Sequence, residues 1–238
     1  MTVAGPVRSL TIAVALASAV SIRSPAQAKP GPYASMAPVS AYLMPDRAAE
    51  IALARSAAPN AISSHATVLV LGPRGYETAV QGTNGFTCVV ERSWMSPFDS
   101  WQFWNPHLRG PICYNPAAVR SILPITIRRT ELVLTGASPT PDGVRAALAS
   151  GTLPPLEPGA MSYMMAKDGF LDDSGGHWVP HLMFFAAAAD SASWGADVPG
   201  SPVLLNPQFL AAPERIAVFM VPLRVWSDGS PARALTGQ

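Results

Sequence analysis

Short apolar runs separated by turn-forming residues dominate the part of the chain between residues 66 and 94. ATVLVLG is a β-branched apolar run, YETAVQ alternates in polarity, and FTCVVERSW places apolar residues two apart. PRG and GTNG separate the runs, and Asn84-Gly85 is typical of a β-hairpin turn. The pattern predicts a three-stranded antiparallel meander over 66–94.

Further elements follow from the same kind of pattern. Helix-forming residues behind Asp46 predict a helix over 46–57, and PDGVRAALASG predicts another over 141–151. The β-branched segments 122–136 and 214–226 predict strands, and Pro222 favours an edge position or a bulge for the second.

Apolar residues also predict a short element at 160–166 and a strand within HLMFFAAAA, which starts at 181. Together these segments favour an α+β fold. We expect one domain over 46–238, built on an antiparallel sheet with two or three short helices and long Pro-rich loops. An extended N-terminal arm over 29–45 precedes it.

The first 28 residues have the pattern of a secretory signal peptide. Arg8 gives a positive start, LTIAVALASAV is an apolar run of suitable length, and AQA ends at Ala28 with small residues where a signal peptidase cleaves. The run is too short to span a membrane comfortably. We expect cleavage after Ala28, export to the periplasm or the extracellular space, and no transmembrane segment afterwards.

Charge and composition exclude some classes of partner. The 238 residues include 16 basic and 15 acidic side chains with no basic stripe, so nucleic acid is not an expected partner. Many Ala, Pro and Arg residues are typical of a GC-rich bacterial genome. The expected partner is an unknown small molecule or a component of the cell envelope.

Cys88 and Cys113 are the only two cysteines. In an oxidising compartment an even count favours a disulfide, here closing a 26-residue loop. Such a bond would stabilise the fold by roughly 3 kcal/mol on the loop-entropy model. Two buried free thiols are the alternative.

Residues 95–118 combine aromatic residues with Pro, Asn and Gly, which predicts a long irregular excursion. Aromatic side chains on such a segment can line a ligand groove or pack as a satellite core, and the sequence favours packing. The candidate ligand-binding residues in and beyond the excursion are Trp101, Trp104, Trp178 and Trp194.

The segment FLDDSGGHWVPHL offers candidate catalytic residues, namely Asp172, Asp173, His177 and His181. The two histidines are four apart, but Pro180 between them disfavours a shared helical face, and in a strand they would lie about 13 Å apart. A shared metal site is therefore not predicted. Adjacent aspartates before Ser-Gly-Gly also suit a polar turn.

No nucleophile elbow, phosphate loop or dinucleotide motif is present. MSYMM, with Met161, Met164 and Met165, contains thioethers that suit Cu(I), but methionine as a core filler is the preferred interpretation. No cofactor is predicted. The expected function is that of an exported, non-catalytic binding or envelope-associated module. The alternative is a secreted or periplasmic hydrolase that uses an Asp/His site within 172–181.

Overall fold

The computed structural model describes Met1 and residues 32–136, 140–173, 176, 178–210 and 212–232. By its internal contacts the chain divides into Met1–Pro30 and Gly31–Gln238, and the fold below is that of the second unit. The predicted signal peptide falls on residues outside the described ranges, apart from Met1. It therefore stays a prediction.

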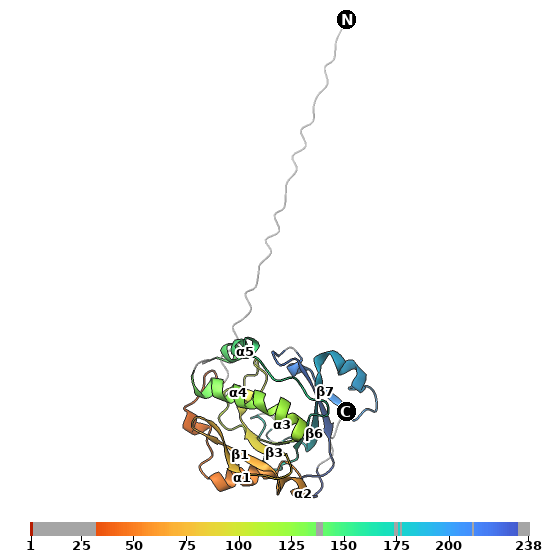
Figure 1. Cartoon of the computed structure of the whole chain (residues 1–238). Helices are drawn as coiled ribbons and strands as arrows, with labels where there is room; N and C mark the ends of the chain where they lie inside the picture. The colour runs from red at the N-terminus through yellow and green to blue at the C-terminus, as the bar shows by residue number, and fades with distance from the viewer. Residues whose placement is uncertain (2–31, 137–139, 174–175, 177, 211, 233–238) are drawn as a thin grey trace. The chain divides into compact units, whose positions relative to one another are not determined.

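An eight-stranded open sheet organises the described part of the chain (Figure 1). The strands run in the order β2-β1-β3-β4-β5-β6-β8-β7, and every neighbouring pair is antiparallel except β1 and β3. The strands are β1 (Thr67–Gly72), β2 (Gly75–Val80), β3 (Thr87–Glu91), β4 (Gly110–Tyr114), β5 (Met161–Met164), β6 (His181–Ala187), β7 (Leu204–Asn206) and β8 (Ile216–Pro222). A mostly antiparallel sheet with few helices confirms the α+β class.

Helices cover both faces of the first half of the sheet. On one side α1 contacts β1, β3 and β4, while on the other α3 contacts β4 and β5, and α4 contacts β2 (Figure 1). The α-helices are α1 (Arg47–Arg55), α2 (Asn60–Ser63), α3 (Pro116–Ser121), α4 (Leu123–Leu134) and α5 (Pro141–Ala149). The short 3₁₀ helices are η1 (Val39–Ala41), η2 (Ser93–Met95), η3 (Ala188–Trp194) and η4 (Pro207–Phe209). The predicted helices at 46–57 and 141–151 are confirmed as α1 and α5.

The predicted meander is wrong in its connection, although its three strands are present. β3 does not pair with β2 but runs parallel to β1, with Thr67 opposite Thr87. The Asn84 side chain accepts a hydrogen bond from the backbone N–H of Phe86 and donates one to the Ile62 carbonyl. This turn therefore packs onto the chain before β1. The turn carries the chain across the start of β1 and does not close a hairpin.

The predicted strand at 122–136 is wrong, because this segment forms α4. Its buried residues recur at helical spacing, as Ile125, Arg129 and Val133 show. Arg120 and Ser121 end α3, which Asn115 caps by accepting a hydrogen bond from the Ala118 N–H. β-branched composition favoured a strand, but the three-to-four-residue spacing determined the structure.

Two further predictions need correction, one for the excursion over 95–118 and one for the strand over 214–226. The excursion predicted over 95–118 is irregular only in its first part, since 110–114 forms the central strand β4 despite Pro111. β8 is an interior strand between β6 and β7, not an edge. Pro222 is tolerated there because β7 pairs only with 218–220, so the proline lies beyond that ladder.

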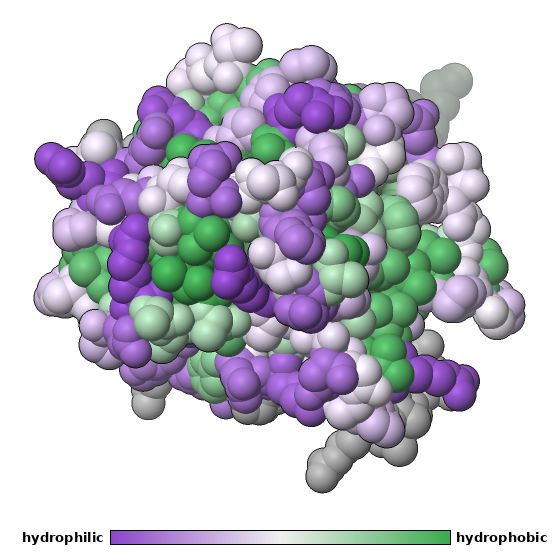
Figure 2. Space-filling model, turned by 60° about the horizontal axis from the view of Figure 1, so that its bottom comes forward, coloured by the Kyte–Doolittle hydropathy of each residue, from purple (hydrophilic) through white to green (hydrophobic). Residues whose placement is uncertain are grey.

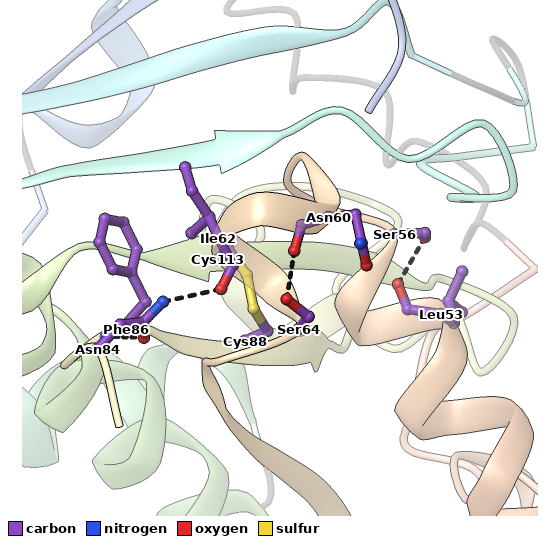
Figure 3. The surroundings of a disulfide bond; sticks show 9 residues. All are labelled: Leu53, Ser56, Asn60, Ile62, Ser64, Asn84, Phe86, Cys88 and Cys113. Atoms are coloured by element: carbon purple, nitrogen blue, oxygen red, sulfur yellow. Dashed lines mark hydrogen bonds between the residues drawn. A yellow bond between two sulfur atoms is a disulfide. The ribbon is translucent and has the colours of Figure 1, made fainter. Parts of the chain in front are cut away.

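The cysteine pair is confirmed as a disulfide. Cys88 on β3 and Cys113 on β4 are directly opposite, with Cα atoms 4.0 Å apart. The bond lies beneath α1 and α2 (Figure 3), among small buried residues that include Ala54, Ala57 and Val68. The bond joins β3 to the segment that ends the aromatic excursion, as the positions of the two cysteines in the sequence predicted.

The side of the molecule that carries α1 and α2 shows hydrophobic residues in separate areas among polar ones (Figure 2). None of the helices in the described ranges has the length and apolarity needed to cross a membrane.

Candidate functional site

A cleft of about 440 Å³ lies on the sheet face opposite to the disulfide. Strand residues form its floor, and three irregular segments surround them. These segments are the first part of the aromatic excursion, the residues Leu171, Asp172 and Trp178, and the chain around η4. The cleft therefore joins parts of the chain that lie more than 100 positions apart in the sequence.

The floor takes its shape from strand register. Met164 on β5 is opposite His181 on β6, and Met183 on β6 is opposite Met220 on β8. Opposite residues of an antiparallel pair share a face, as do residues two apart on one strand. These four side chains therefore share one sheet face, and all four line the cleft.

Hydrogen bonds with α4 hold the first part of the aromatic excursion in place. The indole N–H of Trp94 donates to the Thr130 hydroxyl at 2.9 Å, and Arg129 donates to the carbonyls of Trp94 and Ser96. Arg129 also lies 4.2 Å from the centre of the Phe98 ring. This anchoring lets an irregular segment hold a fixed position beside the sheet.

The aromatic residues of the excursion fall into two groups, those buried in the core and one exposed at the cleft. Trp94, Phe103 and Trp104 are buried with Tyr42 in one core cluster. Trp101 instead is 47% exposed and lines the cleft. The predicted preference for packing is thus right for Trp104, while Trp101 remains available to a ligand.

A hydrogen-bond network of Tyr33, Asn105 and Asp173, which we call the latch, lies beside the cleft. Asp173 accepts from the Tyr33 hydroxyl at 2.5 Å and from Asn105 Nδ2 at 3.2 Å, and Asn105 also donates to Gln102 at 2.5 Å. The bond to Asp173 raises the pKa of the Tyr33 hydroxyl. The Tyr33 ring stacks with Trp101 at a centroid distance of 6.2 Å. The latch therefore joins the N-terminal arm, the excursion and the 173 turn.

His181 is the best-defined ionisable group on the floor. It is 8% exposed, and its Nδ1 lies 2.8 Å from the Val179 carbonyl oxygen. Because a carbonyl only accepts, Nδ1 carries the hydrogen and Nε2 is the acceptor nitrogen. Burial lowers the pKa of the imidazole, against the opposing effect of this hydrogen bond. The neutral imidazole is thus favoured, with its hydrogen on Nδ1.

Two buried N–H donors at the cleft have no hydrogen-bond partner in the described part of the structure. They are Gln102 Nε2 and the indole nitrogen of Trp178. Each belongs to a residue that lines the cleft and is less than a tenth exposed. Because an unpartnered buried donor costs about 1–3 kcal/mol, both are candidate ligand contacts.

Glu91 lies between the cleft and a smaller apolar cavity of about 80 Å³, and lines both. Desolvation raises the pKa of its carboxyl group, while hydrogen bonds from Tyr114 and Thr126 act in the opposite direction. The smaller cavity also contains the buried ion pair of Arg129 and Glu214, whose nitrogen and oxygen are 2.6 Å apart.

The structure brings together four of the eight candidate residues. Asp172, His181, Trp101 and Trp178 line the cleft. Asp173 lies in the latch beside it, and His177 is outside the described residues.

The remaining two candidates lie elsewhere. Trp104 is in the core, and Trp194 packs against Phe184 and Phe219 on the other sheet face. Most cleft residues were not predicted as site residues, among them Glu91, Gln102, Met183 and Met220. A glutamate ending the apolar run TCVVE was the one local signal among them.

Comparison with known proteins adds no family to this description. No family model matches the sequence, and neither the curated proteins nor the solved structures include a significant match. The functional argument therefore rests on the chemistry of the cleft.

Proposed function

We propose that this chain is an exported, non-catalytic binding protein that takes a small neutral molecule into the cleft. The observation that carries the proposal is that Gln102 and Trp178, whose side chains each carry a buried unpartnered N–H donor, line one cleft together with the exposed Trp101. A volume of about 440 Å³ lies within the ordinary range of small-molecule sites.

Charge at the cleft does not favour an anionic ligand. Arg92 lines the cleft, but its guanidinium is paired with the Glu50 carboxylate at 2.7 Å, with both side chains buried. Burial lowers the pKa of His181 and so favours its neutral form, while Asp172 and Glu91 also line the cleft. A ligand with a flat apolar face could stack on Trp101 while its acceptor groups meet the two free donors.

Export is part of the proposal and has two supports. The first 28 residues have the pattern of a signal peptide. The disulfide between Cys88 and Cys113 is of the kind that persists in oxidising compartments. N-terminal sequencing of the protein from its native host should find Lys29 first, and an intact Met1 end would contradict export with cleavage.

A hydrolase remains the alternative, because Asp172 and His181 line the same cleft. Binding is favoured over hydrolysis by the orientation of His181. Its Nδ1 donates to a backbone carbonyl, whereas a catalytic base usually donates to a carboxylate that stabilises the imidazolium. Turnover of chromogenic ester, amide or glycoside substrates that is lost in His181→Ala would support the alternative.

The binding proposal can be tested with neutral ring compounds, such as monosaccharides, nucleosides and small aromatic amides. Binding is measured by tryptophan fluorescence and by the shift in melting temperature. Trp101→Ala should weaken binding of any hit about tenfold, the value of one lost aromatic contact. Trp194→Ala is the matched control, since Trp194 is 38% exposed but lies on the other sheet face.

Two results would count against the proposal. One is a set of hits that Trp101→Ala leaves unchanged. The other is equal weakening by Trp194→Ala, which would place binding outside the cleft.

A further inference from the structure

Methionine side chains collect around His181 on the floor of the cleft. Met164 is directly across from His181, and Met183 is two positions along β6, directly across from Met220. Cβ atoms of opposite residues lie about 4.5–5.5 Å apart, and residues two apart on a strand lie about 6.6 Å apart. His181, Met183 and Met220 are neighbours at these spacings, so their side chains can reach one point above the sheet. Met164 and Met220 are separated by a whole strand and by two positions, so Met164 lies beside this group and is not part of it.

The arrangement of His181 suits a metal ligand. Its Nδ1 hydrogen bond to the Val179 carbonyl leaves Nε2 with a free lone pair. Histidines that ligate metals usually donate their other ring nitrogen to a carbonyl or carboxylate in this way, which fixes the tautomer.

We propose that His181, Met183 and Met220 form a site for one soft monovalent metal ion, Cu(I) or its analogue Ag(I). Thioether and imidazole donors select soft cations. All three donors are neutral ligands, so they suit an ion of low charge. Within the described ranges, no three His, Cys, Asp or Glu side chains gather to hold a harder ion.

Trp178 completes one side of this site. Its ring lies edge-on to the His181 ring, with centroids 6.4 Å apart, and it also lines the cleft. An aromatic ring beside a bound cation excludes water and can add a cation–π attraction when its face is presented.

The inference shares the cleft with the proposed function but needs no organic ligand. The metal site depends on residues of the strand floor, whereas binding of a ring compound depends on Trp101 at the rim. Trp101→Ala should therefore leave metal binding unchanged, so the two proposals can fail separately.

The test uses the purified chain with its disulfide intact, because free thiols would bind the same ions. Among the described residues both cysteines are paired, so no thiol competes. Cu(I) is titrated without oxygen against the chelator bicinchoninate. Ag(I) is titrated while the ¹³C signals of methionine methyl groups are recorded. We expect one ion per chain and shifts in the methyl signals of Met183 and Met220.

Conservative variants locate the site without removing core volume. Met183→Leu and Met220→Leu should each weaken Ag(I) and Cu(I) binding about tenfold or more, because one sulfur donor is lost. Met165→Leu is the matched control. Met165 is also buried but is not among the residues that line the cleft. Its methyl signal should not shift, and its replacement should not change affinity.

Three outcomes would overturn the inference. They are no uptake of either ion in competition with the chelator, equal weakening by Met165→Leu, and binding that the Met183 and Met220 variants leave intact. Zn²⁺, a borderline divalent ion, serves as the comparison, and uptake of Zn²⁺ as tight as that of Cu(I) would also contradict a site for a soft monovalent ion.

Discussion

The two faces of the sheet bury very different side chains. Beneath α1 and α2, the face that contains the disulfide is packed with short residues such as Ala54, Ala57 and Val68. The opposite face carries long and polar side chains, including Arg129, Glu91 and the methionines of the cleft floor. The cleft and the smaller apolar cavity both open on this second face.

The difference shows how one sheet can combine a closely packed face with a face that carries a cleft. Short side chains let helices approach closely and pack densely. Long side chains and buried charges leave space between the sheet and the segments that cover it. Unpartnered donors such as Gln102 Nε2 are tolerated on that face, where a ligand can satisfy them.

On the sheet face that carries the cleft, we expect the largest loss of stability when Glu214 is replaced. Its carboxylate pairs with Arg129, and both side chains are almost fully buried. Glu214→Ala leaves a buried guanidinium without its counter-ion, so we expect unfolding free energy to fall by about 3–5 kcal/mol. Urea denaturation measures the change.

The control uses an exposed pair on the same helix. Arg128 and Glu131 are 3.3 Å apart and about half exposed, so Glu131→Ala should cost less than about 1 kcal/mol. Equal losses for the two variants would mean that burial does not separate these ion pairs.

The closely packed face should depend on its disulfide. Replacing both Cys88 and Cys113 by alanine should lower the unfolding free energy by roughly 3 kcal/mol, since the bond closes a 26-residue loop. The measurement is denaturation of the double variant beside the oxidised protein. Because the bond lies on the other face, Ag(I) binding by the folded variant should survive. Loss of that binding would show that the two faces are coupled.

Most of the local elements could be predicted from the sequence, but their connections could not. Alternating or β-branched runs located β1, β2, β3, β6 and β8, and helix formers located α1 and α5. The turn that leads to the parallel pairing of β1 and β3 contacts the chain before β1, where Asn84 donates to the Ile62 carbonyl, 22 positions away. No local pattern encodes such a contact, so Asn84-Gly85 indicated a hairpin instead.

The site was predicted in part for the same reason. His181 and Trp101 stood out as chemically distinctive residues, and both line the cleft. The cluster MSYMM drew attention to three neighbouring methionines, yet only Met164 lines the cleft. Its companions Met183 and Met220 come from β6 and β8, and only strand register places them beside it.

The smallest change in stability that we expect on the cleft side of the sheet comes from Glu91. Burial raises the pKa of its carboxyl group. A carboxyl whose folded-state pKa is raised supports folding below its unfolded pKa and loses that support as pH rises through the folded value. Glu91→Gln keeps an acceptor for Tyr114 and Thr126 but cannot ionise. The variant should therefore gain stability relative to the natural protein as pH rises from 4 to 7.

We expect a gain at pH 7 on the order of 1 kcal/mol, the size of one hydrogen bond, and little difference at pH 4. Thermal denaturation at both pH values gives the comparison, with Glu157→Gln as a control. Glu157 is a carboxylate whose pKa is lowered by its exposed contacts with Arg120, so its replacement should not stabilise the protein at pH 7. A Glu91→Gln variant that is less stable at pH 7 than at pH 4, relative to the natural protein, would mean that the ionised carboxylate is the form this face stabilises. Glu91 would then be a permanent negative charge beside the cleft, and a cationic ligand would fit better than a neutral one.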